Sequence, residues 1–215
     1  MPDTLPIAFL GFLLGMRHAV DPDHVVAVTA ITARHPSFAR SALVGVLWGV
    51  GHTLTLLIVG GSIVLFKVGI SHRFGVALEL SVAGMLVYLG FSNLVAARRG
   101  TASITAPSST RPLIVGAVHG LAGSAAVALL VVGVVSSPAA AIGYLLLFGS
   151  GTVLGMLLVT LLVAMPARLA LQRVGWARHW LTIASGVVSV VMGIWLAREL
   201  TSPNAGPEKA THSAR

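Results

Sequence analysis

The sequence has no cysteine and few charged residues among its 215 positions. The absence of cysteine excludes disulfide bonds, thiolate metal ligands and a cysteine nucleophile. Charged residues make up only 9% of the chain, whereas an ordinary soluble domain has about 25%. So few charges cannot cover a soluble surface, which excludes a soluble enzyme and a free nucleic-acid-binding domain. No Gly-x4-Gly-Lys-Ser/Thr motif occurs, so the sequence lacks a P-loop for ATP.

Apolar residues dominate instead, at 56% of the chain with a mean hydropathy of +0.93. Six apolar segments each reach the roughly 17–25 residues that a membrane-crossing helix needs. They cover residues 5–32, 41–66, 75–96, 112–135, 139–165 and 179–198. The sequence therefore predicts an all-α integral membrane protein with six transmembrane helices. We expect one polytopic membrane domain over residues 1–200 and a disordered tail over residues 201–215.

The basic residues lie mostly in the gaps between these segments, and their distribution predicts the orientation of the chain. The net charge is +8, from 14 Lys and Arg against 6 Asp and Glu. One side of the membrane would hold Arg34, Arg40, Arg98, Arg99, Arg111, Arg168, Arg173 and Arg178, and the other Lys67, Arg73, Arg198, Lys209 and Arg215. The positive-inside rule then places both termini outside the cytoplasm, in a multi-pass protein of the inner (plasma) membrane.

The two halves of the chain resemble each other. The segment Gly-Met-Arg-His-Ala-Val at 15–20 is followed 101 residues later by Gly-Ala-Val-His-Gly-Leu at 116–121. Each half has three predicted crossings, so the second half must enter the membrane from the opposite side. We expect two inverted three-helix repeats with a substrate site between them near the midplane. The repeats would cover about 5–96 and 112–198. The alternative is chance recurrence of Gly, Ala and Val in an apolar chain.

An ionisable cluster, Arg-His-Ala-Val-Asp-Pro-Asp-His at 17–24, interrupts the first apolar segment. A charged residue near the bilayer centre costs roughly 2.5–3.5 kcal/mol on insertion scales, so such residues persist where they pair, face a cavity or bind an ion. Pro22 opens the helix and frees the carbonyl of His18, which we expect a bound cation or its water to satisfy.

The side chains of this cluster suit a divalent transition metal. Imidazole and carboxylate ligands without a thiolate favour nickel, cobalt or zinc over magnesium and calcium. On a regular helix His18, Asp21 and His24 share an arc of about 120°, and Asp23 points elsewhere unless the helix breaks. One alternative is that Arg17 neutralises an aspartate while the histidines fill the core. Another is a proton relay.

Two further histidines lie in apolar segments. His52 has glycine close by in Trp-Gly-Val-Gly-His-Thr at 48–53, and it is either a ligand or a core histidine bonded to a backbone carbonyl. His119 corresponds to His18 in the second half, among small residues, and its role as a ligand is left open. The candidate metal residues are His18, Asp21, Asp23, His24, His52 and His119. We also expect Asn93 to hydrogen-bond between helices, and the four tryptophans to anchor at the membrane interfaces.

The motif at 17–25 closely resembles the signature of the nickel/cobalt transporter family, His-x4-Asp-His on one helix. The motif at 48–53 is similar to the family's Gly-His-Ser/Thr turn on the next helix. The chain length and the segment 119–124 look most like the short UreH-like branch, the urease accessory membrane proteins. The resemblance implies a Ni²⁺ or Co²⁺ permease that uses His18, Asp23, His24 and His52. Pro22 stands where the family usually has Ala, and the fourth and fifth segments contain no Asp or Glu.

These observations favour a metal permease without enzymatic activity. The expected substrate is Ni²⁺ or Co²⁺, with no permanently bound cofactor, and the expected surroundings are the lipid bilayer. One alternative is a non-transporting accessory protein for nickel-enzyme maturation, and another is an exporter of metal or of another small solute. An intramembrane metalloenzyme is disfavoured because His-Glu-x-x-His is missing. A homo-oligomer, accessory subunits and the direction of transport are left open.

Overall fold

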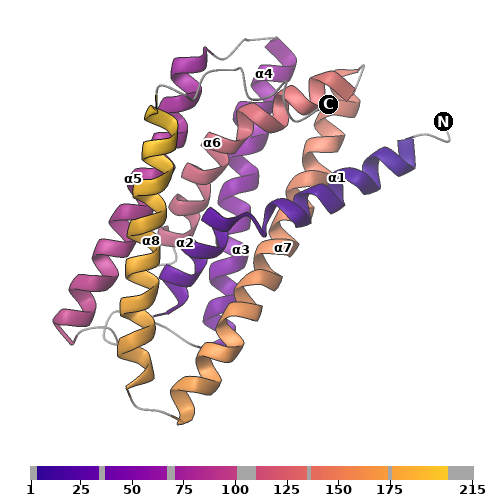
Figure 1. Cartoon of the computed structure of the whole chain (residues 1–215). Coiled ribbons are helices and arrows are strands. Elements are labelled where there is room, and N and C mark those ends of the chain that lie inside the picture. Colours follow the sequence, from indigo (N-terminus) through magenta and orange to yellow (C-terminus); the bar gives the residue numbers. More distant parts are fainter. Residues whose placement is uncertain are drawn as a thin grey trace, which may run out of the picture.

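The computed structural model describes residues 4–33, 37–66, 71–100, 110–134, 137–173 and 176–202, and every element within these ranges is helical (Figure 1). The elements are α1 (Thr4–His18), α2 (Pro22–Thr32), α3 (Phe38–Thr55), the π-helical turn η1 (Leu56–Gly60), α4 (Gly61–Phe66), α5 (His72–Arg98), α6 (Thr110–Val134), α7 (Pro138–Arg173) and α8 (Ala177–Thr201). The predicted all-α class is confirmed for these residues. The predicted disordered tail lies outside them after residue 202.

Four helical segments are long and apolar enough to cross a membrane, as expected for a membrane protein. They are Phe38–Phe66, Arg73–Arg98, Pro138–Leu169 and His179–Thr201. The first apolar segment is divided into α1 and α2, of 15 and 11 residues, and each is shorter than the roughly 17–25 residues of a complete span. The helix α6 is not among the four either. The prediction of six spans is therefore confirmed for four segments and stays a prediction for the other two.

The division between α1 and α2 has a local cause at Pro22. Proline lacks an N–H and is favoured in the first turn of a helix, so α2 begins there with Asp21 as its N-cap residue. The backbone carbonyl of His18 accepts the N–H of Asp21 at 3.1 Å. The prediction that a cation or its water would satisfy this carbonyl is therefore wrong, because the turn itself satisfies it.

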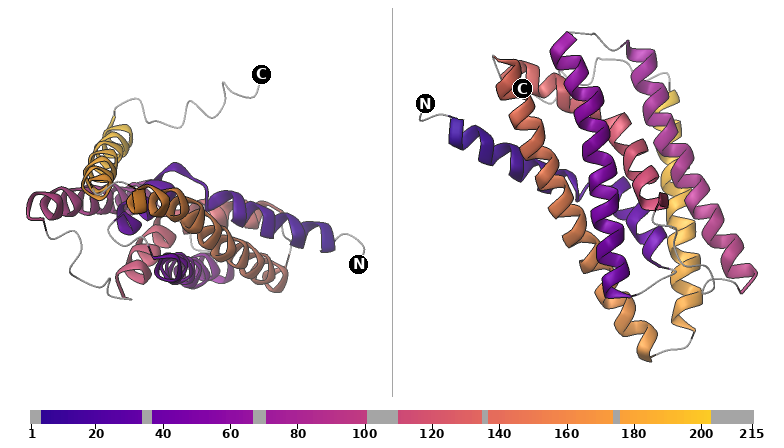
Figure 2. Two further views of the ribbon diagram at one scale, coloured as in Figure 1. Left: turned by 90° about the horizontal axis from the view of Figure 1, so that it is seen from below. Right: turned by 180° about the vertical axis from the view of Figure 1, so that it is seen from behind.

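The helices form a bundle in which α5 pairs with α8 at one edge and α1 packs on α7 at the other (Figures 1 and 2). Between them, α3 contacts both α6 and α7. Asn93 of α5 connects this edge pair to its surroundings as expected, because its amide donates to the carbonyl of Ala30 in α2 at 2.7 Å and to Ser185 Oγ in α8 at 3.1 Å.

Glycines let these backbones approach closely. A Cβ atom on Gly51 of α3 would collide with the carbonyl oxygen of Leu113 in α6. A Cβ atom on Gly151 of α7 would likewise collide with the carbonyl oxygen of Phe12 in α1. Such contacts allow dense packing without a hydrophobic driving force between helices in lipid.

The close approach of α3 and α6 predicts that Gly51→Ala destabilises the protein by about 1–3 kcal/mol, the usual effect of overpacking. The matched control is Gly84→Ala in α5, since no atom lies within 4 Å of the added methyl group. Thermal unfolding of the purified variants in detergent measures the difference. Equal midpoints for the two variants would contradict the packing at Gly51.

Candidate metal site

Three histidines from three helices converge inside the bundle. His18 ends α1, His24 lies in the first turn of α2, and His52 lies near the end of α3. Their ring centroids are 4.7 Å apart for His18 and His24, 5.1 Å for His18 and His52, and 5.5 Å for His24 and His52. One ring nitrogen from each lies within 4.8 Å of the others. We call these residues the histidine cluster.

The cluster is shielded from the surroundings. His24 and His52 are 3% and 0% exposed, whereas 19% of the His18 side chain is accessible. The Nε2 atoms of His18 and His24 and both ring nitrogens of His52 are buried without a hydrogen-bond partner among the described residues. Leaving a buried polar group unsatisfied costs about 1–3 kcal/mol, so four such atoms at one point favour a bound ion or ordered water there.

Two aspartates each contact the Nδ1 atom of one histidine. Asp21 Oδ2 lies 2.7 Å from Nδ1 of His18, and Asp23 Oδ1 lies 3.1 Å from Nδ1 of His24. A carboxylate in this position keeps the proton on Nδ1 and leaves the lone pair on Nε2, which is the usual arrangement behind a metal-binding histidine. The carboxylates thus orient the ring nitrogens, whereas the sequence grouped all of these residues as candidate ligands.

His52 has no such support. The sequence left open that it is a core histidine bonded to a backbone carbonyl, but within the described part of the chain neither ring nitrogen has a partner. The same part of the chain gives no support to neutralisation of the aspartates by Arg17. That side chain is exposed, and the ion-pair partners of Asp21 and Asp23 are histidines.

His119 of α6 lies beside the histidine cluster and contacts Asp23. Its Nε2 is 3.5 Å from Asp23 Oδ2, and its Nδ1 is 3.3 Å from the carbonyl oxygen of Val115. Its ring centroid is 4.8 Å from that of His24. His119 therefore lies next to both Asp23 and His24, and its Nε2 is also buried without a hydrogen-bond partner among the described residues, but it does not belong to the group of three.

Two residues at the site were not predicted from the sequence. Trp48 was expected at a membrane interface, and this is wrong: it is 0% exposed, and its ring lies 6.1 Å from that of His24 and 5.2 Å from that of His119. Its position four residues before His52, on the same helix face, was the available signal. The three other tryptophans, Trp176, Trp180 and Trp195, are more than half exposed.

Gly123 of α6 is the second unpredicted residue. A Cβ atom built there would lie 3.8 Å from Nε2 of His18 and 3.9 Å from Cε1 of His52. The absence of a side chain on Gly123 therefore leaves space directly beside the unpartnered nitrogens. A pattern of small residues in α6 gave no hint of this, because the same pattern serves ordinary helix packing.

The arrangement suits a borderline divalent cation. Neutral imidazole nitrogens bind nickel, copper, zinc and related ions, and the two aspartates nearby balance two positive charges in a buried place. Two donors on one ion at about 2.1 Å each can be at most about 4.2 Å apart. The three nitrogens lie within 4.8 Å of one another, so they need to move closer by at least about 0.6 Å to bind one ion together.

The fold and the cluster define a helical membrane protein with a histidine-rich interior site. Among curated proteins, the chain is 39% identical over 207 residues to the urease accessory protein UreH of Bacillus sp. (strain TB-90). The alignment covers 89% of this chain and 90% of that relative. The chain belongs to the UreH-like branch of the nickel/cobalt transporter family, as the motifs at 17–25 and 48–53 predicted.

More distant relatives come from Arabidopsis thaliana. The chloroplast proteins FOR GROWTH AND FERTILITY 1 and 2 are each 27% identical, over 213 and 209 residues. The matches cover 88% and 89% of this chain but only 58% and 56% of those proteins. The chain thus spans a little over half of their length. No protein-family model and no solved structure matches the chain.

The geometry predicts that aspartates and histidines of the site contribute differently to the affinity for Ni²⁺. Asp23→Asn removes an orienting partner and should weaken Ni²⁺ binding about 10–100-fold, the usual effect of losing such a partner. His24→Ala removes a donor atom and should weaken it further. Titration calorimetry of the purified protein measures both affinities. An equal loss in the two variants would identify Asp23 as a ligand instead.

Proposed function

We propose that this protein is a membrane permease for Ni²⁺ or Co²⁺ and that the histidine cluster binds the ion in transit. The observation that carries the proposal is the set of buried ring nitrogens of His18, His24 and His52, which converge without partners in a helical membrane protein. Groups that could ionise or bind ions are rare inside membranes and generally mark ion pathways. The family membership supports the same substrate class.

We further propose that the protein consists of two inverted repeats that move relative to each other. Corresponding contacts support this. A Cβ atom on Gly15 would collide with the carbonyl oxygen of Phe148, and a Cβ atom on Gly116 with that of Trp48. Gly15 and Gly116 are 101 residues apart, and Trp48 and Phe148 are 100 apart, so the two contacts exchange when the repeats are exchanged.

The third helices of the proposed repeats pair in the same reciprocal way. A Cβ atom on Gly90 would lie 2.5 Å from the carbonyl oxygen of Gly186, and one on Gly193 would lie 2.6 Å from that of Ala83. Gly193 follows Gly90 by 103 residues, and Gly186 follows Ala83 by the same 103 residues, so exchanging the repeats converts one contact into the other. Contacts of this kind pair α5 with α8 in opposite directions, which is what an inverted repeat requires.

The histidine cluster lies where the proposed repeats meet. All three histidines belong to the first repeat, whereas α6 of the second repeat brings Gly123 and His119 against them. A relative movement of α6 would therefore change access to the cluster. No ATP-binding motif is present, and the membrane potential supplies about 4.6 kcal/mol per 100 mV for a divalent ion that crosses the full drop.

A second candidate is a membrane accessory protein that hands nickel to an enzyme without transporting it. The printed name of the relative from Bacillus, urease accessory protein, favours this reading. The sequence argues against it, because the stretches between the apolar segments are short and leave little chain for docking a soluble partner. A metal site is common to both candidates, so transport itself has to be measured.

We expect cells that lack their own nickel permeases to accumulate radioactive nickel when they express this protein. His52→Ala should reduce the uptake at least about 10-fold, because it removes a ligand that nothing else replaces. The matched control is Arg73→Ala, an exposed residue at the start of α5 outside the cluster, which should transport normally at equal expression. Depletion of nickel instead of accumulation would indicate export.

The outcome separates the two candidates. If the purified wild-type protein binds Ni²⁺ through the cluster but cells show no difference in uptake, the accessory role stands and the permease is excluded. If neither binding nor uptake depends on His52, the metal site itself is excluded.

Gly123 gives a second test of the same site. An added methyl group would meet the rings of His18 and His52 at ordinary contact distances, so Gly123→Ala should fold normally. It would occupy the space beside Nε2 of His18, and we expect nickel affinity to fall several-fold. The control is Gly143→Ala in α7, where an added methyl group meets no atom within 4 Å. Unchanged affinity in Gly123→Ala would place the ion elsewhere.

A further inference from the structure

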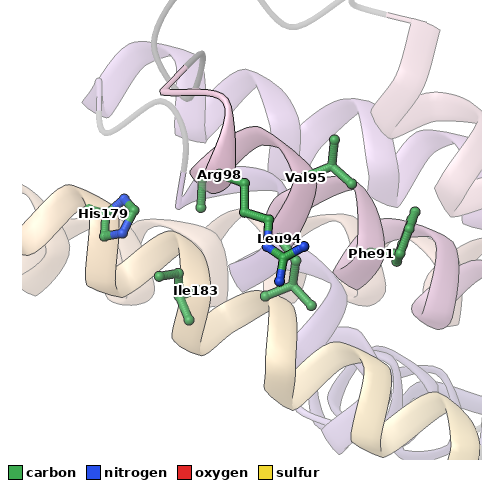
Figure 3. Close-up of a pocket in the computed structure, with 7 residues that line it drawn as sticks. Phe91, Leu94, Val95, Arg98, His179 and Ile183 are labelled. Atoms are coloured by element: carbon green, nitrogen blue, oxygen red, sulfur yellow. The ribbon is translucent and has the colours of Figure 1, made fainter.

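A pocket of about 400 Å³ lies between α5 and α8, near the end of the bundle where α5 finishes and α8 begins (Figure 3). It is lined by Phe91, Leu94, Val95, Ala97, Arg98, His179 and Ile183. None of these residues belongs to the histidine cluster or to the residues around it. The pocket therefore needs an explanation apart from metal binding.

The lining of the pocket is amphipathic. Figure 3 shows His179 at one end and Phe91 at the other, with the side chain of Arg98 extending between them toward Leu94. Arg98 and His179 belong to the ends of the two helices, and apolar side chains make up the rest of the lining. A ligand that fits this lining has an anionic group joined to an apolar chain.

No acidic side chain that the structure describes neutralises the positive charge at the pocket. Within the described residues Arg98 is exposed and forms no ion pair with an acidic side chain. The acidic residues of the two helices, Glu79 and Glu199, lie near the opposite end of α5 and of α8. Arg99, next to Arg98, is exposed as well and adds a further positive charge.

The pocket also lies where two candidate membrane spans end, the position at which lipid headgroups are expected. Arg98 and His179 are terminal residues of the candidate membrane spans Arg73–Arg98 and His179–Thr201. Trp176 and Trp180 are 66% and 58% exposed at the same end of α8, and exposed tryptophans are typical of the membrane–water interface. Phe91 is 64% exposed, so the apolar part of the pocket is open to acyl chains.

We propose that this pocket binds an anionic phospholipid. The phosphate lies against Arg98 and His179, and an acyl chain lies along Phe91, Leu94 and Ile183. Basic pockets between membrane helices bind anionic headgroups in this way, and the two basic side chains without a nearby acid favour an anionic over a zwitterionic lipid. The bound lipid bridges α5 and α8. Because Asn93 connects this pair to α2, the lipid also stabilises the helix that carries His24.

The test uses the full chain purified in detergent. Phosphatidylglycerol and phosphatidylcholine with identical acyl chains are added separately, and thermal unfolding and native mass spectrometry are recorded. We expect phosphatidylglycerol to raise the unfolding midpoint and to remain bound at one molecule per chain, with at least about 10-fold tighter binding than phosphatidylcholine. Equal effects of the two lipids would overturn the proposal.

Variants separate the two parts of the pocket. Arg98→Gln combined with His179→Gln should remove the preference for phosphatidylglycerol, whereas Arg73→Gln, at the exposed opposite end of α5, should keep it. Ile183→Trp fills the apolar part with both basic groups retained, and it should weaken binding of the lipid as well. Wild-type binding in the double variant would overturn the proposal.

Inorganic phosphate distinguishes a lipid from a free anion. Phosphate alone should leave the unfolding midpoint unchanged, because it lacks the chain that fills the apolar part. A shift with phosphate as large as that with phosphatidylglycerol would identify an anion site and overturn the lipid assignment. This inference does not depend on metal transport, so nickel binding and lipid binding can fail separately.

Discussion

The break between α1 and α2 is the constraint on which the histidine cluster depends. On one continuous helix His18 and His24 would be about 9 Å apart along the axis, since each residue adds about 1.5 Å. Across the break their ring centroids are 4.7 Å apart. Pro22 enforces the break because it cannot continue the hydrogen bonds of α1, and Asp21 completes it as the N-cap residue of α2. The same aspartate then orients His18.

Close packing brings the third histidine to this point. A Cβ atom on Gly120 of α6 would collide with the carbonyl oxygen of His52, so a larger residue there would push α3 and α6 apart. Trp48, one turn earlier on α3, fills the space on the other side of the rings of His24 and His119. The small residues thus do more than shorten interhelical distances, because they set the position of a polar group that has no hydrogen bond of its own to hold it.

The sequence predicted which residues come together in the candidate site better than the role of each residue in it. The spacing in residues 17–24 and the glycines around His52 indicate a polar group inside a membrane, and both motifs identify the family. The roles depend on which nitrogen of each ring is already occupied. The turn at residues 19–21 decides which nitrogen of His18 is occupied. These residues do not form regular helix, and the turn brings the carboxylate of Asp21 to Nδ1 of His18. A helical projection cannot represent such a turn, so it could not separate orienting carboxylates from donor atoms.

The fold likewise was predicted in part: the long helices followed from the sequence, whereas the break in the first apolar segment and the burial of Trp48 did not. Long apolar runs gave four of the spans directly, because length and hydropathy are additive properties of a segment. The first apolar segment was predicted as one span, but Pro22 divides it into two short helices. A hydropathy average over a segment contains no information on where a helix changes direction. The position of Trp48 was predicted wrongly for a related reason. Tryptophan as a residue type is typical of membrane interfaces, but here its ring contacts histidines from α2 and α6.

In the proposed permease the unequal contribution of the two halves has a mechanical consequence. The three candidate ligands lie on α1, α2 and α3, and the paired aspartates lie on the same continuous part of the chain. The helices that carry them also pack on the second half, α1 on α7 and α3 on both α6 and α7, so a movement of the second half acts on the cluster through these contacts. It also changes the contact of His119 with Asp23 and the distance of Gly123 from His18. In the proposed mechanism the second half thus takes part in transport through packing against the cluster and needs no acidic ligands of its own.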